Sequence, residues 1–168
     1  MKLVTVLGAA LSIGVATWLA SGSAFADTMD CSGTKIAKER RNFEVIKPGD
    51  RPDRQLRQYV RLDVLSSDNP ALDGTEQTVF VHEELIGPVG RHSGVGEFAL
   101  RNGERLWYRF QGTSFRTDAS GTWTARYHGV YEFLSGSGRY SAIQGAAHYE
   151  GEVTPSAQTE RFTCSATY

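Results

Sequence analysis

Apolar and polar residues alternate with a period of two along most of the chain from Gln58 onward, and turn residues recur every eight to fifteen positions. This alternation is typical of strands with one buried face, and no helical periodicity is sustained anywhere beside it. A chain of strands without crossover helices predicts an antiparallel sheet, which either closes into a barrel or folds into a sandwich.

We expect about eight strands, at residues 35–46, 58–66, 77–86, 93–100, 104–115, 121–133, 146–153 and 160–168. In the second of these, Val60, Leu62 and Val64 alternate with Tyr59, Arg61 and Asp63. Asn102-Gly103 is a strong hairpin signal between two neighbouring strands. Twelve glycines lie between Gly87 and Gly151, several of them inside strands, where glycine permits the sharp bends of barrel corners. The sequence therefore favours a single eight-stranded antiparallel barrel, with a β-sandwich as the alternative.

The first 26 residues have the features of a cleavable export signal. Lys2 precedes an apolar stretch over residues 3–20, and Ala24-Phe25-Ala26 forms a small-x-small cleavage site. A membrane anchor is the alternative reading of this stretch, but glycines and threonines dilute it. We expect residues 27–168 to form one domain that is secreted or periplasmic.

Both cysteines lie in the expected mature chain, Cys31 near its start and Cys164 near its end. An exported protein meets conditions in which disulfides form and persist, so we predict a Cys31–Cys164 bridge. Two unpaired thiols are the alternative.

Charge and motif spacing exclude several classes of partner. Without Lys2, 17 of the 18 basic residues remain against 19 acidic ones, a net charge of about −2 that argues against nucleic acid and acidic membranes. The two cysteines and four histidines have no metal-ligand spacing, so we expect no metal. The glycine run at 136–151 has Ser141 where a dinucleotide fingerprint needs its third glycine, and it lacks the P-loop lysine. No cofactor is expected, and the oligomeric state is not predicted.

The same glycine run carries a family resemblance. Gly121-Thr122-Trp123 to Phe133, then Gly136-Ser137-Gly138-Arg139-Tyr140, Ile143-Gln144-Gly145-Ala146 and Tyr149-Glu150-Gly151, resembles the GTGxF…GAxGxG signature of the allene oxide cyclase and dirigent-like barrels. Residues 102–108 are similar to a hairpin of bacterial relatives of that family. The resemblance covers about residues 93–153 and consists of structural glycines and aromatic residues. It implies an eight-stranded barrel with an apolar pocket, of the kind whose plant members steer cyclisation or coupling of hydrophobic small molecules. The family's acidic catalytic residues are matched to no position here, so catalytic residues stay unassigned.

An eight-stranded barrel has room inside for packed side chains or for one small ligand. If the aromatic side of residues 121–133 faces inward, the candidates for the pocket wall are Trp123, Tyr127 and Tyr131, with Tyr108 and Phe110 on the neighbouring strand and Tyr149 opposite. The tyrosine hydroxyls need hydrogen-bond partners. They either bond to the backbone or to one another at the barrel rim, or they lie at the mouth or floor of an apolar pocket. His82 and Glu84 share one face of their strand. They either lie at the mouth or floor of the pocket, where such groups can move a proton, or point to solvent.

Three functions follow from these patterns. The first is an exported barrel that binds a small hydrophobic or aromatic molecule in its interior. The second is a cyclase or isomerase that uses the same pocket. The third is a non-catalytic module with a filled barrel whose loops contact another protein of the cell envelope.

Overall fold

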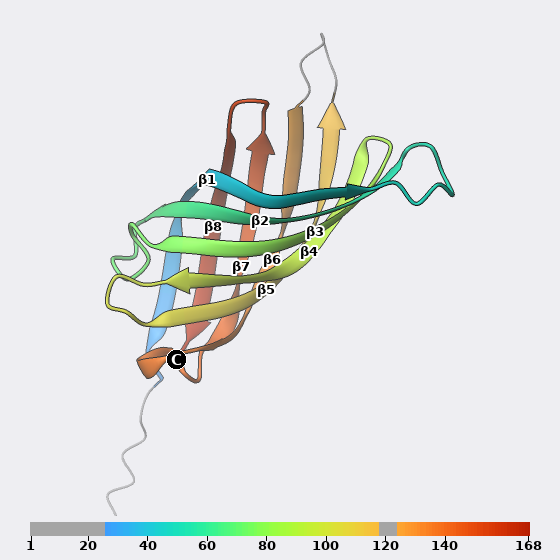
Figure 1. Cartoon of the computed structure of the whole chain (residues 1–168). Helices are drawn as coiled ribbons and strands as arrows, with labels where there is room; N and C mark the ends of the chain where they lie inside the picture. Colours follow the sequence, from blue (N-terminus) through green and yellow to red (C-terminus); the bar gives the residue numbers. More distant parts are fainter. Residues whose placement is uncertain (1–25, 118–123) are drawn as a thin grey trace, which may run out of the picture.

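A computed structural model describes residues 26–117 and 124–168, and within them eight antiparallel strands close into a barrel in sequential order (Figure 1). The strands are β1 (Thr28–Ile46), β2 (Arg54–Ser67), β3 (Glu76–Ile86), β4 (Val89–Ala99), β5 (Arg105–Thr117), β6 (Thr124–Gly136), β7 (Gln144–Val153) and β8 (Gln158–Thr167). The predicted eight-stranded antiparallel barrel is thus confirmed, and the sandwich is not formed. Among the described residues, no helix has the length and apolar character needed to cross a membrane.

The barrel is closed by pairing between its first and last strands. β1 and β8 are in register over nine residue pairs, from Thr28↔Thr167 to Ile36↔Thr159. Beyond Ile36, β1 continues to Ile46 in pairing with β2 alone. The barrel wall is therefore complete at the end that holds the C-terminus and is interrupted between β1 and β8 toward the other end.

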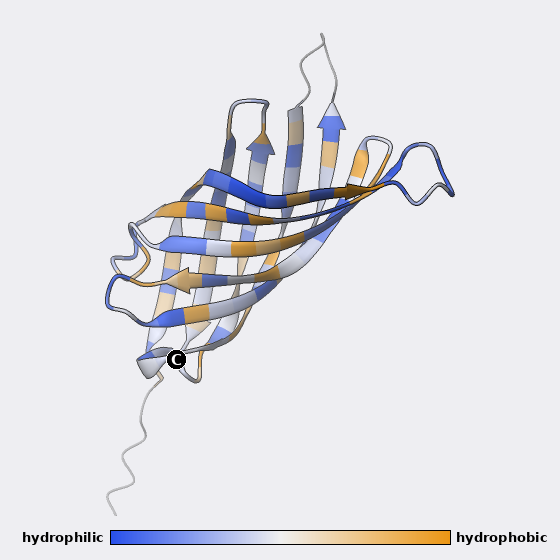
Figure 2. Ribbon diagram, in the orientation of Figure 1, coloured by the Kyte–Doolittle hydropathy of each residue, from blue (hydrophilic) through white to orange (hydrophobic). Residues whose placement is uncertain are grey.

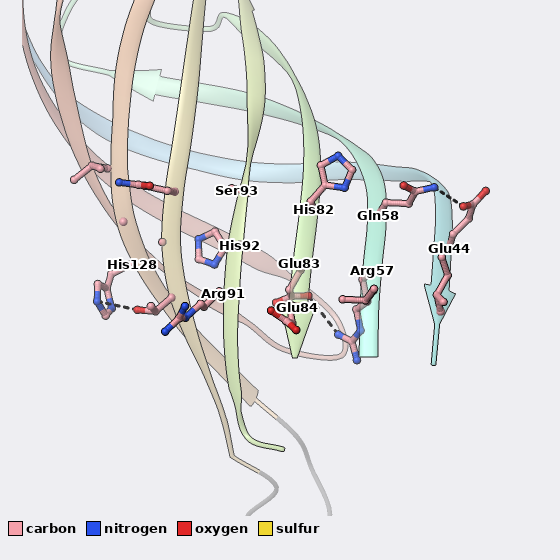
Figure 3. Close-up of a pocket in the computed structure, with 17 residues that line it drawn as sticks. Glu44, Arg57, Gln58, His82, Glu83, Glu84, Arg91, His92, Ser93 and His128 are labelled. Atoms are coloured by element: carbon pink, nitrogen blue, oxygen red, sulfur yellow. Dashed lines mark hydrogen bonds and ion pairs between the residues drawn. The ribbon is translucent and has the colours of Figure 1, made fainter. Parts of the chain in front are cut away.

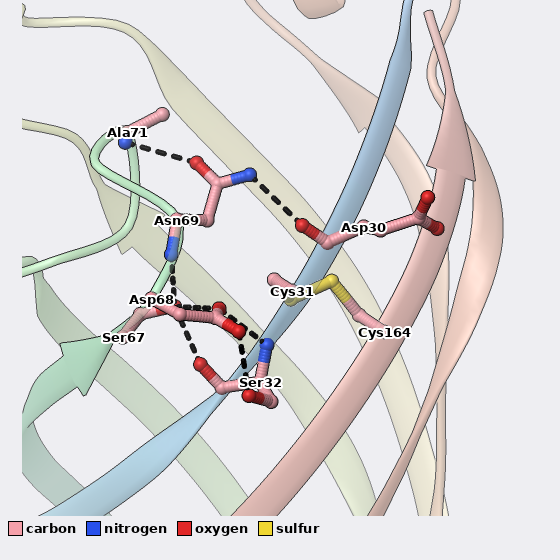
Figure 4. The surroundings of a disulfide bond; sticks show 8 residues. All are labelled: Asp30, Cys31, Ser32, Ser67, Asp68, Asn69, Ala71 and Cys164. Carbon is pink, nitrogen blue, oxygen red and sulfur yellow. Dashed lines mark hydrogen bonds between the residues drawn. A yellow bond between two sulfur atoms is a disulfide. The ribbon is translucent and has the colours of Figure 1, made fainter.

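The disulfide joins these two closing strands. Cys31 and Cys164 are directly opposite each other in the β1–β8 ladder and are bonded to each other, as predicted. The loop between β2 and β3 contacts β1 beside them, because Asp68 accepts a hydrogen bond from the Ser32 amide at 2.7 Å and Asn69 donates one to the Asp30 carbonyl at 3.1 Å (Figure 4). The closed end is thus held by one covalent bond and by this loop.

Hydrophilic and hydrophobic residues alternate along the strands (Figure 2). Buried and exposed residues alternate in the same way, so one row of side chains lies inside the barrel and the next outside. At the closed end the interior is filled by apolar residues that include Met29, Leu65, Leu106 and Ile143. The turn η2 (Gly138–Tyr140) adds Tyr140, which is 1% exposed and packs against Tyr168. Gly138 begins this turn with φ +58°, a conformation that glycine adopts without strain.

On β2 the inward row is not the apolar one. Tyr59, Arg61, Asp63 and Leu65 are buried, whereas Val60, Leu62 and Val64 are only partly buried on the outer face. The reason lies across the barrel, since the buried Glu160 on β8 pairs with Arg61 at 3.3 Å and with the buried Lys35 on β1 at 2.7 Å. Hydrophobic alternation by itself predicts the opposite orientation, with Val60, Leu62 and Val64 facing the barrel interior.

Two irregularities bend the part of β1 that pairs with β2 but no longer with β8. Register shifts between Ala37 and Glu39 and between Arg41 and Glu44 each insert an extra residue against β2. At the second one Asn42 has φ +52°, and the Phe43 ring lies 5.7 Å from the ring of Tyr59, which is an inward residue. Phe43 therefore lies on the inner face of the sheet at the open end.

We predict that breaking the disulfide destabilises the barrel. The bond spans 133 residues of sequence, and the loop-entropy account assigns about 2–5 kcal/mol to such a closure. Thermal unfolding with and without a reducing agent measures the effect, which should appear as a lower Tm. The Cys31→Ser/Cys164→Ser variant should have the lower Tm and no further response to the reductant, and equal transitions in all four samples would contradict the prediction.

Candidate functional site

The barrel encloses a cavity of about 50 Å³ between its middle and its open end. Residues from β2 to β8 line it, and β1 contributes none. Its wall combines aromatic rings, aliphatic side chains and ionisable groups: Tyr59, Phe110, Tyr127, Tyr131 and Tyr149; Val79, Val81, Ala125 and Val153; and Arg61, Glu83, His92, Ser114, Gln158 and Glu160. The cavity is partly open, and because no residue of β1 lines it and β1 leaves β8 beyond Ile36, we place its entrance on that side.

Four of the aromatic residues expected in the pocket wall are there. Phe110, Tyr127, Tyr131 and Tyr149 are buried and line the cavity. Tyr108 is also buried, but it packs deeper, against Phe98 and Tyr131, and its hydroxyl accepts a hydrogen bond from the Gln77 amide. Trp123 lies outside the described residues.

The floor of the cavity is a buried ionic network centred on Glu160. The Lys35 ammonium lies 2.7 Å from Glu160 Oε1 and donates a hydrogen bond to the Tyr131 hydroxyl at 2.6 Å. Tyr131 itself donates to Glu160, and the Lys35 ammonium stands 3.9 Å from the centre of the Tyr131 ring. Burial lowers the pKa of Lys35, while the Glu160 carboxylate opposes that change.

A second cation completes the network. Arg61 Nη2 lies 2.8 Å from Asp63 and 3.3 Å from Glu160. Lys35, Arg61, Asp63 and Glu160 are each less than a tenth exposed, so two positive and two negative groups compensate one another inside the barrel. The hydroxyl of Tyr127 approaches the same carboxylate at 3.4 Å and accepts a hydrogen bond from the Gln158 amide at 3.1 Å. The aromatic wall is therefore held in place by charged groups.

His92 and Tyr149 form a neutral hydrogen-bonded pair at the cavity wall, with His92 Nε2 and the Tyr149 hydroxyl 2.7 Å apart. Burial, aided by the nearby Arg61 charge, lowers the pKa of His92 to about 4, and burial raises the pKa of Tyr149. The pair has room because Gly112 and Gly129 stand beside it. A Cβ on Gly112 would lie 2.5 Å from His92 Nε2, and one on Gly129 would lie 2.3 Å from the Tyr149 hydroxyl.

His82 and Glu84 do not lie at this cavity, because they are on the outer face of β3. Figure 3 shows them among the residues that line a furrow on the barrel surface. The residues that alternate with them, Val79, Val81 and Glu83, take the inner positions. Glu84 forms an ion pair with Arg54 at 2.8 Å, and the His82 ring packs edge-on against Phe80. This corrects the reading that placed the pair at the mouth or floor of the pocket and supports its solvent-facing alternative.

The furrow that contains His82 and Glu84 has a volume of about 730 Å³, but it is a gap between two rows of side chains on an open sheet. One row runs in register through Glu44, Gln58, His82, Ser93, Gln111 and Val130, and the other through Ile46, Leu56, Glu84, Arg91, Thr113 and His128. Outer furrows of about 770 and 540 Å³ have the same arrangement elsewhere on the barrel. Such spacing is a property of any pleated surface, so we place the candidate site in the enclosed cavity.

Sequence reasoning missed the polar half of this site. His92 falls just outside the strand expected at residues 93–100, but it is in β4 and points inward. Arg61 gave no signal because it lies in an alternating stretch as an ordinary polar residue. Lys35 and Glu160 are separated by 125 positions, and only the β1–β8 closure brings them together.

A comparison of the sequence with known proteins finds no matching family model and no matching curated protein.

We predict that Glu160→Gln destabilises the protein by about 3–5 kcal/mol, because it leaves Lys35 and Arg61 buried with one carboxylate between them. Urea unfolding measures this. The double variant Lys35→Met/Glu160→Gln restores the charge balance and should lose less than the single variant. Glu132→Gln is the control, since its partner Arg109 is exposed and the change should cost less than about 1 kcal/mol. Equal losses in Glu160→Gln and Glu132→Gln would refute the role of the network.

We also predict that His92 makes the fold acid-sensitive between about pH 6.5 and pH 4. Its pKa of about 4 in the folded state lies below the ordinary value near 6.5, so the unfolded chain takes up this proton first as the pH falls. Between about pH 6.5 and pH 4 this group should therefore lower the free energy of unfolding by about 3 kcal/mol.

Urea unfolding at a series of pH values tests the window. His92→Gln should remove this part of the pH slope, whereas His82→Gln, which removes an exposed imidazole, should keep it. The same slope in His92→Gln and in the unchanged protein would show that His92 is not the group responsible.

Proposed function

We propose that the protein binds a small apolar or aromatic molecule at the open end of the barrel, with part of that molecule inside the cavity. The observation that carries this proposal is the cavity wall, in which five aromatic rings surround a small space and the side chains of His92, Tyr127 and Tyr149 are hydrogen-bonded within the wall. Such a mixture of apolar wall and few fixed polar groups is typical of ligand sites.

The size of the cavity sets how a ligand would lie. About 50 Å³ is roughly a third of the ~150 Å³ of a cavity that holds benzene, so the enclosed space admits a head group or the edge of a ring. The rest of the ligand would lie in the open end, where Phe43 is 50% and Val45 44% exposed on the inner face of the sheet. Apolar side chains exposed on an inner face favour an apolar ligand there.

Two further observations support the wider proposal of an exported binding protein. The disulfide favours an oxidising compartment, in agreement with the export signal expected in residues 1–26. The family that residues 93–153 resemble handles hydrophobic small molecules in barrels of eight strands. The ionisable groups at the cavity, His92 and Glu160, would also serve a cyclase or isomerase, but no catalytic residue is assigned here.

A fluorescent apolar probe, the neutral compound phenylnaphthylamine, tests the binding proposal. We expect its fluorescence to rise on addition of the folded protein and the rise to be lost in Ala125→Trp, which places a large side chain at the partly exposed cavity wall. Leu134→Trp adds the same side chain on the outer face, where Leu134 is 49% exposed, and should bind as the unchanged protein does.

Absence of probe binding would contradict the proposal, as would equal binding by Ala125→Trp. The second outcome would favour the module that contacts another protein, with an apolar surface on the outer row that contains Val60 and the exposed Phe80 and Val95.

A further inference from the structure

A single arginine spans the interruption in the barrel wall. Arg40 stands opposite Arg61 in the β1–β2 pairing, so both side chains are on the inner face of the sheet. Its Nη2 donates a hydrogen bond to the Gln158 side chain on β8, and its guanidinium lies 5.3 Å above the ring of Tyr59 on β2. Gln158 and Tyr59 both line the cavity, so Arg40 lies across its side entrance.

The charge of Arg40 is not compensated. Inside and around the cavity, three cations and three carboxylates pair with one another: Lys35 with Glu160, Arg61 with Asp63 and Glu160, and Arg57 with Glu83. Within the described part of the chain, Arg40 forms no ion pair, and its partners are a neutral amide and an aromatic ring. Its neighbour Arg41 differs, because it is paired with Glu39 at 2.7 Å. The entrance therefore has one positive charge in excess.

We propose that Arg40 is an anion-binding residue and that the ligand is an apolar organic anion, such as a carboxylate or sulfonate. This rests on the proposed function, because it places the ligand at the same open end. A guanidinium offers two parallel donors that match the two oxygens of such a group. The Gln158 side chain has only one neutral amide oxygen and cannot accept from both donors in this way. The incoming anion replaces Gln158 as the partner of Arg40.

The surroundings of Arg40 suit the rest of such a molecule. Phe43 and Tyr59 form an apolar surface next to the guanidinium, with ring centres 5.7 Å apart. Tyr59 and Gln158 also line the cavity, so this apolar surface borders it. The carboxylates nearest in sequence, Glu39 and Glu44, are bound to Arg41 and Gln58, on the outer face in the case of Glu44. An anion at Arg40 thus meets a cation and an apolar wall together.

Two probes that share an aromatic skeleton test the proposal. Anilinonaphthalene sulfonate carries an anionic group that phenylnaphthylamine lacks. Fluorescence titration of the folded protein should show that the sulfonate binds about tenfold more tightly. Arg40→Gln should weaken sulfonate binding about tenfold and leave binding of the neutral probe unchanged. Arg41→Gln is the matched control, since it removes the same charge one residue away, and it should change neither affinity.

The outcomes separate this inference from the proposed function. Binding of both probes with equal affinity, or a sulfonate affinity that is the same in Arg40→Gln, overturns the role of Arg40 and leaves the binding function standing. Equal weakening by Arg40→Gln and Arg41→Gln also overturns it, because it indicates attraction by net charge alone. If the neutral probe fails to bind, the proposed function itself fails. Circular dichroism spectra of the variants confirm that the comparison is made between folded proteins.

Discussion

Pairing between β1 and β8 is the constraint on which the rest of the structure depends. Nine in-register residue pairs and one disulfide join the first and last strands and turn an eight-stranded sheet into a closed wall. The same ladder brings Lys35 next to Glu160 and so creates the buried network. Where it ends, at Ile36 and Thr159, the wall opens, and the inner face of β1 becomes accessible. Closure and entrance are thus two consequences of one ladder of limited length.

The interior of this barrel is organised by charge as much as by apolar packing. Removing four charged groups from water is costly, and their mutual pairing repays that cost only in a good geometry. In return, the hydroxyls of Tyr127 and Tyr131 have fixed partners on Glu160. The result is a stiff aromatic wall around a small cavity. This arrangement has the preorganisation that binding sites need, because few groups must be ordered when a ligand enters.

The architecture was predictable from the sequence because it depends on features that recur along it. Alternation located the strands, Asn102-Gly103 placed the hairpin between β4 and β5, and the two cysteines were paired correctly. Because alternate residues of a strand face the same side, the inward orientation of Tyr127, Tyr131 and Tyr149 could be predicted once a barrel was assumed.

The chemistry of the site was not predictable in the same way, since it depends on contacts between distant positions. In β2 the buried face carries Arg61 and Asp63, and the apolar residues of the alternating pattern lie on the outer face. The residue shifts at Ala37–Glu39 and Arg41–Glu44 leave no mark in the composition, yet they put Arg40 and Phe43 on the inner face. His82 and Glu84 looked suitable as acid–base groups and lie outside, while His92, ten residues from His82, lies inside.

Methyl NMR spectroscopy gives the most direct test of where a ligand binds. In a titration with phenylnaphthylamine, we expect the methyl signals of Val79, Val81 and Val153 to shift together, since these residues line the cavity. The signals of Val95 and Leu134, which are exposed on the outer face, should stay in place. Shifts confined to Val95 and Leu134 would show that the barrel interior is closed to ligands and would contradict the account.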